Sequence, residues 1–317
     1  MKKRVIVIDD NRLSICILSD ILVREGYEVR AIWETASCMD SIISADPVLI
    51  LMDIVMPGIN GVDLCRILKG NTLTRNIPVI MITSITDIEV LKSAFDAGAV
   101  DYIRKPYNPI EIAVRARSAI QIYEQQKRLE FLALYDGLTE IYNHKTVIDL
   151  IRKDYQKALN QNLPYSMIMT DIDSFKKIND RYGHPAGDEI LRNISGLMRE
   201  QFEKTGLVGR YGGEEFCIGI PGNGERKAEI LKKAVEDSLF CVQDMEIRVT
   251  ISIGVAVCCI QTKEFAAEEI LSIADKQLYL AKNSGKNCVK CEIITKDKVT
   301  AEKHVRGSRE EKKCLEK

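Results

Sequence analysis

The sequence predicts two domains of different classes: an N-terminal α/β domain with a doubly wound parallel sheet, joined by a helical linker to a C-terminal α+β domain with a mainly antiparallel sheet. In the first third of the chain, short apolar runs rich in β-branched residues alternate with amphipathic helical stretches, which is typical of βαβ units. In the second half, neighbouring strand-like runs without a helix between them lie among helices, which favours an antiparallel sheet. A chain of 317 residues is long enough for two domains, each with its own core.

The strands of the N-terminal domain are expected at residues 5–8, 27–32, 48–52, 78–82 and 100–103. Gly26 and Gly98 follow the first and fourth helical stretches, where a glycine commonly ends a helix. From residue 109 to residue 134 the pattern is purely helical. We expect this segment to be the last helix of the domain, extended into a linker that pairs with a second copy as a coiled coil. The alternative is an amphipathic helix packed on its own domain.

In the C-terminal domain, strands are expected at residues 166–170, 216–220 and 248–257, and helices at 185–204, 225–239 and 266–283. Gly285 marks the end of the last helix. The predicted boundaries are 1–108 for the first domain's core, 109–134 for its last helix and the linker, 135–292 for the second domain, and 293–317 for a tail rich in Lys and Glu that we expect to be disordered.

Composition and charge argue against several classes of protein. The formal net charge of -1 gives no chain-wide attraction to nucleic acid or to anionic membranes. The first apolar run meets Asp9 and Asp10 after four residues, and no run approaches the roughly 18 apolar residues of a membrane span, so we expect a cytoplasmic protein. The ten cysteines are scattered through core segments and are expected to be reduced. Cys288 and Cys291 form a CxxC without a second pair at zinc spacing.

Polar residues that could form one site follow the ends of four predicted strands of the first domain: Asp9 and Asp10, Asp53, Thr83, and Lys105. In a doubly wound sheet the carboxyl ends of the strands face one crevice. Crowded carboxylates repel one another unless a divalent cation lies among them, and Mg²⁺ prefers carboxylate oxygens and water. Such a cation and Lys105 would offset the charge of a phosphoryl group that Asp53 attacks.

With Met56-Pro57-Gly58, Gly61 and Lys105-Pro106, this pattern resembles the receiver domains of response regulators over residues 1–125. The resemblance implies that Asp53 accepts a phosphoryl group from a histidine kinase or a phosphotransfer protein. It also implies one Mg²⁺ held by Asp10, Asp53 and the backbone carbonyl of Val55. Further implied members of the site are Asp9 in support, Thr83 as a phosphoryl ligand, Tyr102 as an aromatic that changes position, and Lys105.

A second constellation lies in the C-terminal half. The run Arg210-Tyr211-Gly212-Gly213-Glu214-Glu215-Phe216 places two glycines and two carboxylates directly before a predicted strand. Adjacent glycines suit a tight hairpin turn and let backbone amides approach a phosphate. Asp171-Ile172-Asp173 gives a second acidic patch where another strand ends. Acidic pairs on adjacent strands are how many phosphoryl-transfer enzymes bind two metal ions.

Together with residues 176–180, Gly183-His184, Gly187-Asp188 and residues 274–276, these motifs resemble the GGDEF diguanylate cyclase family over residues 130–292. The resemblance implies a homodimer that condenses two GTP into cyclic di-GMP and pyrophosphate. Each half-site would use two Mg²⁺, with Mn²⁺ as a substitute. The implied metal ligands are Asp171, the Ile172 carbonyl, Glu214 and Glu215, and Glu214 would also help deprotonate the 3′-hydroxyl. The implied substrate-binding residues are Asn179 and Asp188 for guanine, Lys176, Lys282 and Lys286 for the triphosphate, and Gly212 and Gly213 in the turn.

The sequence departs from the family's usual pattern at several positions. Glu140 and His144 stand where the family commonly has a glycine and an arginine, and Lys286 stands where it commonly has an arginine. Many members carry an inhibitory product site, R-x-x-D, shortly before the glycines. Glu203 and Gly206 occupy its ends here, so we expect weak feedback by the product.

Three other functions remain open at this point. A degenerate GGDEF domain could bind nucleotide and act as an effector or scaffold, although Asp171, Glu214 and Glu215 are intact. A DNA-binding response regulator is not favoured, because no helix-turn-helix pattern follows the linker. An enzyme that makes another cyclic nucleotide is possible, although the carboxylate of Asp188 favours guanine.

Overall fold

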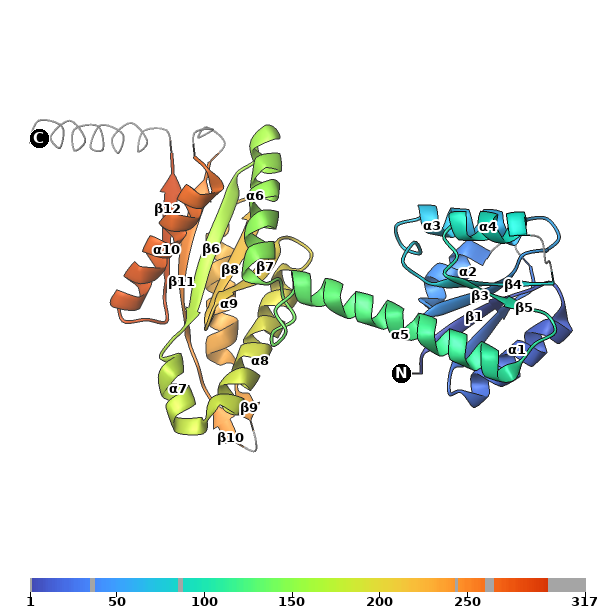
Figure 1. Cartoon of the computed structure of the whole chain (residues 1–317). Coiled ribbons are helices and arrows are strands. Elements are labelled where there is room, and N and C mark those ends of the chain that lie inside the picture. Colours follow the sequence, from blue (N-terminus) through green and yellow to red (C-terminus); the bar gives the residue numbers. More distant parts are fainter. Residues whose placement is uncertain (1, 35–37, 85–87, 243–244, 260–264, 296–317) are drawn as a thin grey trace, which may run out of the picture. The chain divides into compact units, whose positions relative to one another are not determined.

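The computed structural model describes residues 2–34, 38–84, 88–242, 245–259 and 265–295. The chain forms two compact units, Met1–Glu130 and Phe131–Lys317. Helix α5 (Pro109–Leu134) begins in the first unit and ends in the second, and it covers the segment for which the sequence predicts a continuous helix (Figure 1). From residue 296 onward, the tail expected to be disordered lies outside the described residues.

The first unit is a five-stranded, fully parallel sheet in the order β2-β1-β3-β4-β5. Each strand begins and ends within one residue of the predicted position: β1 (Arg4–Ile8), β2 (Glu28–Ile32), β3 (Leu49–Asp53), β4 (Val79–Thr83) and β5 (Asp101–Arg104). The helices that precede α5 are α1 (Arg12–Arg24), α2 (Cys38–Ala45), α3 (Gly61–Gly70) and α4 (Ile88–Asp96). The predicted doubly wound parallel sheet is therefore confirmed.

Helices cover both faces of this sheet, which explains the apolar runs of its central strands β1, β3 and β4. In β3, Ile50 and Met52 pack in the cluster that includes side chains of α2 and α3, whereas Leu49 and Leu51 pack in the cluster with α1 and α5. The side chains of both sets are completely buried. The polar residues that follow the strands are thus carried on a rigid support.

The second unit contains a five-stranded mixed sheet in the order β12-β11-β6-β8-β7. All neighbours are antiparallel except β11 and β12, so the expected mainly antiparallel sheet is confirmed. Its strands are β6 (Tyr165–Ile172), β7 (Leu207–Gly212), β8 (Glu215–Pro221), β11 (Ile251–Cys258) and β12 (Val289–Ile294), and a separate hairpin consists of β9 (Phe240–Val242) and β10 (Met245–Ile247).

Five helices accompany this sheet in the described part of the unit: α6 (His144–Asn160), α7 (Phe175–Tyr182), α8 (His184–Phe202), α9 (Glu225–Asp237) and α10 (Ala267–Asn283). One apolar cluster joins α8 and α9 to one face of the sheet, and another joins α6 and α10 to the opposite face (Figure 1). Helices α8, α9 and α10 were predicted with ends shifted by at most two residues. The strand expected from residue 248 begins only at Ile251.

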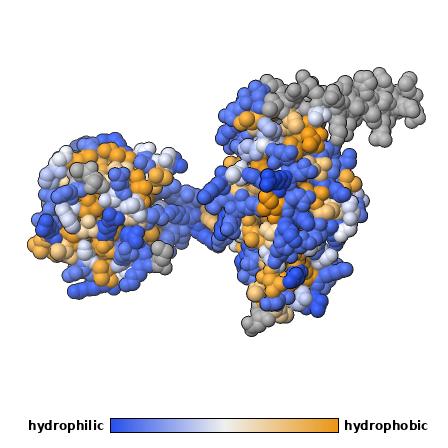
Figure 2. Space-filling view, turned by 180° about the vertical axis from the view of Figure 1, so that it is seen from behind, coloured by the Kyte–Doolittle hydropathy of each residue, from blue (hydrophilic) through white to orange (hydrophobic). Residues whose placement is uncertain are grey.

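The surface visible in Figure 2 is largely hydrophilic, with apolar residues in scattered patches. Within the described residues, no helix combines the length and the apolar character needed to span a membrane. The nine cysteines of the described part are free thiols. Cys288 Sγ donates to the carbonyl of Ala281 near the end of α10, which gives one member of the CxxC a structural contact.

Candidate functional site

The carboxyl ends of β1, β3 and β5 bring three charged side chains together in the first unit. Lys105 Nζ lies 2.5 Å from Asp53 Oδ2 and 3.2 Å from Asp9 Oδ2. Asp9 and Asp53 are buried, whereas Asp10 is exposed, and one carboxylate oxygen of each of the three aspartates lies within 4.8 Å of the others. The predicted acidic cluster is therefore present, with the donor set that Mg²⁺ prefers.

The electrostatics of this cluster favour a bound cation. Burial raises the pKa of Asp9, and the charge of Asp53 raises it further, although the Asn11 backbone N–H and Lys105 act in the opposite direction. Burial acts to lower the pKa of Lys105, but hydrogen bonds and charges from Asp53 and Asp9 outweigh it and raise that pKa. Lys105 is therefore held as a cation beside Asp53.

Neighbouring residues shape the approach to Asp53. The Val55 backbone N–H donates to Asp53 Oδ1 at 3.2 Å, and a Cβ on Gly61 would lie 2.1 Å from the Asp53 carbonyl oxygen. Only a glycine fits at position 61, so α3 can begin close to the acidic cluster. Thr83 is buried at the end of β4. Tyr102 is half-buried, and its ring meets that of Phe95 edge to face at a centroid distance of 6.1 Å.

In the second unit, the glycine turn between β7 and β8 lies beside the end of β6. Asp171 is the register partner of Glu215, and the Ile172 N–H donates to the Glu214 carbonyl oxygen at 3.3 Å. Gly213 has a φ of 41°, in the left-handed region that a glycine tolerates without strain. The two acidic motifs predicted from the sequence therefore converge, with Asp171 buried and both glutamates half-buried.

The charge of Asp171 depends on its neighbours. Burial raises its pKa, Glu214 and Glu215 raise it further, and the Lys282 ammonium group opposes them, with Nζ 2.6 Å from Asp171 Oδ2. A divalent cation would stabilise the same carboxylate more strongly, and carboxylate oxygens suit Mg²⁺. The residue types present suit a metal, although among the described residues only Asp9, Asp10 and Asp53 bring three ligand atoms within 4.8 Å of one another.

Asp173 does not belong to this acidic group, which corrects the view of residues 171–173 as one acidic patch. Its carboxylate accepts hydrogen bonds from Thr250 Oγ1 (2.7 Å), Ser252 Oγ (2.6 Å) and the Asn287 backbone N–H (2.9 Å). Sequence reasoning missed this role. The residues involved come from three distant segments, so only their spatial arrangement identifies them.

The predicted guanine-binding residues lie where α7 meets α8. Asn179 Oδ1 is buried without a hydrogen-bond partner in the described part of the chain. A Cβ on Gly187 would lie 1.9 Å from this oxygen, so the glycine before Asp188 allows the two helices to approach closely. This oxygen faces Gly187 and is closed off from solvent, so a guanine could bond to it only after the Asn179 side chain turns outward.

The predicted triphosphate lysines have different surroundings. Lys282 contacts Asp171, as described, and Lys286 Nζ donates to Ser174 Oγ at 2.8 Å. Ser174 lies directly before α7, whose first turn carries the exposed Lys176. Lys282 and Lys286 thus lie near the end of β6.

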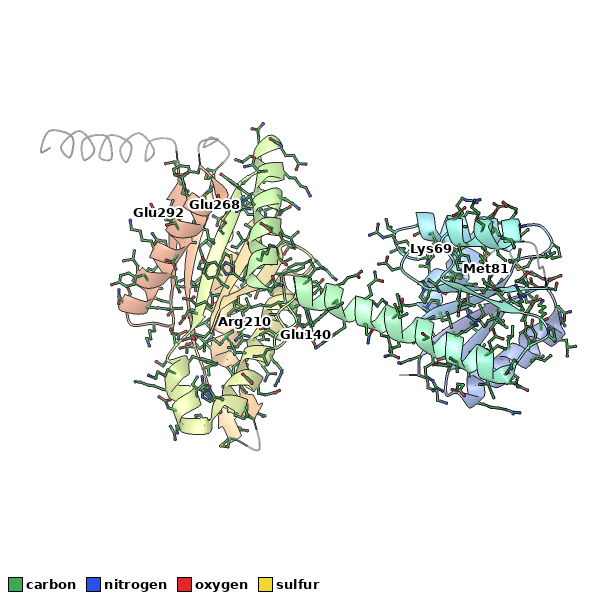
Figure 3. All side chains as sticks on the ribbon, viewed as in Figure 1. Lys69, Met81, Glu140, Arg210, Glu268 and Glu292 are labelled. Atoms are coloured by element: carbon green, nitrogen blue, oxygen red, sulfur yellow. The ribbon has the colours of Figure 1, made fainter. Side chains whose placement is uncertain are left out.

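The segment between α5 and α6 is bonded to the glycine turn. Arg210 Nη1 lies 3.1 Å from Asp136 Oδ1, and its other nitrogens donate to the Gly213 carbonyl at 2.7 and 3.0 Å. Figure 3 labels Arg210 together with Glu140 of the segment that follows α5. His144 stands at a position where the family commonly has an arginine, and its Nδ1 lies 2.7 Å from the Tyr211 carbonyl oxygen. Glu140, where the family commonly has a glycine, has a left-handed φ of 58°.

The position of the usual inhibitory site has no room for an aspartate. A Cβ on Gly206 would lie 2.2 Å from Ile220 Cγ2 and 2.6 Å from the Gly219 carbonyl. Glu203 is exposed and, with Arg199, lines a cavity of about 210 Å³ beside Gly206. Neither end of an R-x-x-D motif is present.

Comparison with known proteins supports the family resemblances of both halves of the chain. Residues 5–117 match the family described as response regulator receiver domain, and residues 133–288 match the one described as diguanylate cyclase, GGDEF domain. Response regulator PleD of Caulobacter vibrioides is 28% identical over 298 residues, which cover 90% of this chain and 65% of that protein. Diguanylate cyclase DgcS of Shewanella oneidensis is 31% identical over 166 residues, which cover 52% of this chain and 55% of that protein. This chain therefore spans less than two thirds of the length of either relative.

A solved structure supports the fold of the second half. The coiled coil and GGDEF domain of DgcB from Caulobacter crescentus, in complex with c-di-GMP, superposes with a TM-score of 0.51. The match covers 58% of this chain and 98% of that one, at 23% sequence identity, so it shows the fold alone. With both family matches in chain order, the protein carries a response regulator receiver domain followed by a GGDEF domain.

Proposed function

We propose that this protein is a diguanylate cyclase that condenses two GTP into cyclic di-GMP and two pyrophosphates under the control of its receiver domain. The observation that carries the proposal is the convergence of Asp171, Glu214 and Glu215 beside the Gly212–Gly213 turn, with Lys282 bonded to Asp171. This arrangement supplies both metal-binding carboxylates and a cation for the substrate's phosphates.

In the proposed reaction the 3′-hydroxyl of one GTP attacks the α-phosphorus of the other, and the bond to pyrophosphate breaks. Glu214 takes the hydroxyl proton. Asp171, Glu214, Glu215 and the Ile172 carbonyl would hold two Mg²⁺, or Mn²⁺ in their place, which would stabilise the negative charge on the phosphates. Lys176, Lys282 and Lys286 bind the triphosphate. Gly212 and Gly213 have no side chains, so their backbone amides can approach the phosphates closely.

Asn179 and Asp188 would select guanine. The carboxylate of Asp188 accepts from the N1–H and amino group of guanine, whereas adenine offers an unprotonated N1 at the same place. The position of Asn179 on α7, where this helix meets the α8 residues that include Asp188, supports this assignment.

One domain supplies one nucleotide pocket, so two domains related by a two-fold axis are needed to place two GTP molecules antiparallel. Helix α5 carries exposed apolar residues at helical spacing on one side, which supports pairing with a second copy: Ile110, Val114, Ile122, Leu129 and Leu132. Burying this stripe between two chains would remove apolar area from water.

The receiver would control this assembly. A histidine kinase or a phosphotransfer protein would donate the phosphoryl group to Asp53, with one Mg²⁺ at Asp10, Asp53 and the Val55 carbonyl, and with Asp9 and Lys105 in support. Thr83 would bind the phosphoryl group and Tyr102 would change position. The resulting population shift would act through α5 on dimer formation.

The test is to incubate the protein with GTP and Mg²⁺, with and without acetyl phosphate, and to separate the products by chromatography. We expect cyclic di-GMP and pyrophosphate, at a rate that rises with acetyl phosphate. The matched controls are Glu214→Gln, which should lose most of the activity, and Asp53→Ala, which should lose only the response to acetyl phosphate. Bound GTP without any product would instead indicate a nucleotide-binding effector.

A further inference from the structure

The buried carboxylate of Asp173 connects three segments of the GGDEF domain. It lies one residue beyond the end of β6, and its backbone N–H donates to the Thr250 carbonyl at 2.9 Å. The side chain, only 8% exposed, accepts from Thr250 Oγ1, Ser252 Oγ and the Asn287 N–H. Burying a carboxylate is unfavourable unless donors replace its hydration, and these three donors do so.

The segment that Asp173 holds has an unusual backbone. After α10, the consecutive residues Gly285, Lys286 and Asn287 have φ values of 104°, 66° and 46°. A left-handed conformation is unfavourable for a residue with a side chain, so two such residues in succession must be held by their surroundings. The bond from the Asn287 N–H to Asp173 and the bond from Asn287 Nδ2 to Glu236 Oε1 (2.9 Å) supply that restraint.

This backbone determines where Lys286 lies. Its Nζ donates to Ser174 Oγ at 2.8 Å, and Ser174 itself has a left-handed φ of 58° directly after Asp173. Asp173 thus restrains both partners of the Lys286–Ser174 contact. It accepts a hydrogen bond from Asn287, the residue after Lys286, and it directly precedes Ser174 in the chain. Ser174 precedes the amino end of α7, where backbone N–H groups favour anions.

We infer that Asp173 is a positioning residue that fixes Lys286 beside the amino end of α7 and thereby determines the affinity of the domain for the triphosphate of its nucleotide. The inference rests on the proposed function only in taking GTP as the ligand. Asp173 neither binds the metal nor contacts the substrate. Without its carboxylate, the turn at residues 285–287 relaxes and Lys286 leaves Ser174.

The test compares nucleotides by calorimetry and kinetics in Asp173→Asn, Lys286→Ala and the double variant. Asp173→Asn should weaken GTP binding and raise the KM for GTP about tenfold, with kcat changed less than threefold, because about one charge-assisted contact is lost. The affinity for GMP should change less than twofold. The double variant should be no weaker than Lys286→Ala alone, because both changes remove the same contact.

Controls keep the test decisive. Lys286→Arg should retain GTP affinity, and Glu229→Gln, which removes an exposed charge on α9, should change nothing. If Asp173→Asn does not fold, Thr250→Val serves as a second variant. It removes one hydrogen-bond donor to the Asp173 carboxylate, which weakens the restraint on the turn at residues 285–287, and it should raise the KM for GTP about threefold. Equal losses of GTP and GMP affinity, or additive losses in the double variant, would overturn the inference. Because binding is measured without turnover, a protein that forms no cyclic di-GMP would refute the proposed function and still test Asp173.

Discussion

Asp10 and Trp33 give the receiver site a built-in reporter. Trp33 is the single tryptophan of the chain and lines a cavity of about 360 Å³ together with Asp9, Asp10 and Met56. We expect Mg²⁺ to change the tryptophan fluorescence saturably. The change should be lost in Asp10→Asn and retained in Glu214→Gln, which alters only the other domain. An unchanged titration in Asp10→Asn would show that the metal binds elsewhere.

The same titration should depend on pH. Burial raises the pKa of Asp9, so this carboxylate gains its proton at a higher pH than an exposed aspartate would. The protonated form attracts a cation less, and Mg²⁺ affinity should therefore fall on acidification, beginning above the usual range of an aspartate. In Asp9→Asn the affinity should be lower at neutral pH and this acid dependence should be weaker. A pH profile identical to that of the wild type would exclude Asp9 as its source.

Glu140 stores conformational strain at the start of the GGDEF domain. Its φ of 58° costs a non-glycine residue ~1–2 kcal/mol, whereas a glycine there loses ~0.5–1 kcal/mol of additional chain entropy on folding. Glu140→Gly should therefore raise the free energy of unfolding by roughly 0.5–1 kcal/mol. Calorimetry of the full chain should show a higher Tm for the GGDEF domain. Glu140→Ala keeps the Cβ and should give no such gain; equal gains in both variants would place the strain in the side chain.

At the scale of elements, the linker end, the following segment and the catalytic hairpin form one bonded unit. Asn143 Nδ2 donates to the Ala133 carbonyl at 2.8 Å, at the end of α5, and Asn143 also caps α6. The Arg210 N–H donates to the Tyr142 carbonyl at 2.8 Å, which attaches this segment to β7. The Arg210 side chain then joins Asp136 to the Gly213 carbonyl in the glycine turn.

Arg210 is therefore expected to matter for both stability and turnover. Arg210→Ala removes both side-chain donors to the Gly213 carbonyl and the cation beside Asp136, which keeps its bonds from Leu138 and Thr139, and this loss should cost about 1–2 kcal/mol of stability. Because the turn carries Glu214, kcat should also fall about tenfold for each 1.4 kcal/mol of lost transition-state stabilisation. Arg210→Lys keeps the charge but not the forked geometry and should recover only part of kcat. Full activity in Arg210→Ala would show that the turn is ordered without this contact.

The elements predicted most accurately from the sequence are those whose hydrophobic pattern has a single physical cause. The central receiver strands β1, β3 and β4 have continuous apolar runs because both of their faces are buried, and this pattern made them easy to predict. Strand β12 was missed although Val289, Cys291 and Ile293 alternate with polar residues, which is typical of a half-buried strand. Helix α7 was missed because polar residues occupy most of its eight positions. The clustered site residues were predicted from motifs, whereas the role of Asp173 depends on Thr250, Ser252 and Asn287, which no local pattern links to it.

At the scale of the whole molecule, the lack of space for an aspartate side chain at Gly206 bears on how the proposed cyclase activity would be regulated. Added cyclic di-GMP should inhibit weakly, because neither charge of an R-x-x-D motif is present beside the glycine turn. Calorimetric titration with the dinucleotide should show no tight site that depends on Glu203 or Arg199. Tight binding lost in Glu203→Ala, with Glu200→Ala as the exposed control, would contradict this expectation.

Receiver phosphorylation would then be the main control, and it would act on assembly. In the proposed reaction two nucleotide pockets must face each other, so activity would depend on the concentration of dimer. The exposed apolar side of α5 offers a surface for pairing, and a receiver that favours the paired form when phosphorylated would increase the dimer fraction at a given concentration.

The most direct test of this account is the specific activity with GTP measured across a dilution series, with light scattering on the same samples, with and without acetyl phosphate. We expect the specific activity to rise with protein concentration in parallel with the dimer fraction. Acetyl phosphate should move that rise to lower concentration, and Asp53→Ala should abolish the shift while keeping the rise. A specific activity that is constant over the series while only monomer is observed would contradict the shared site.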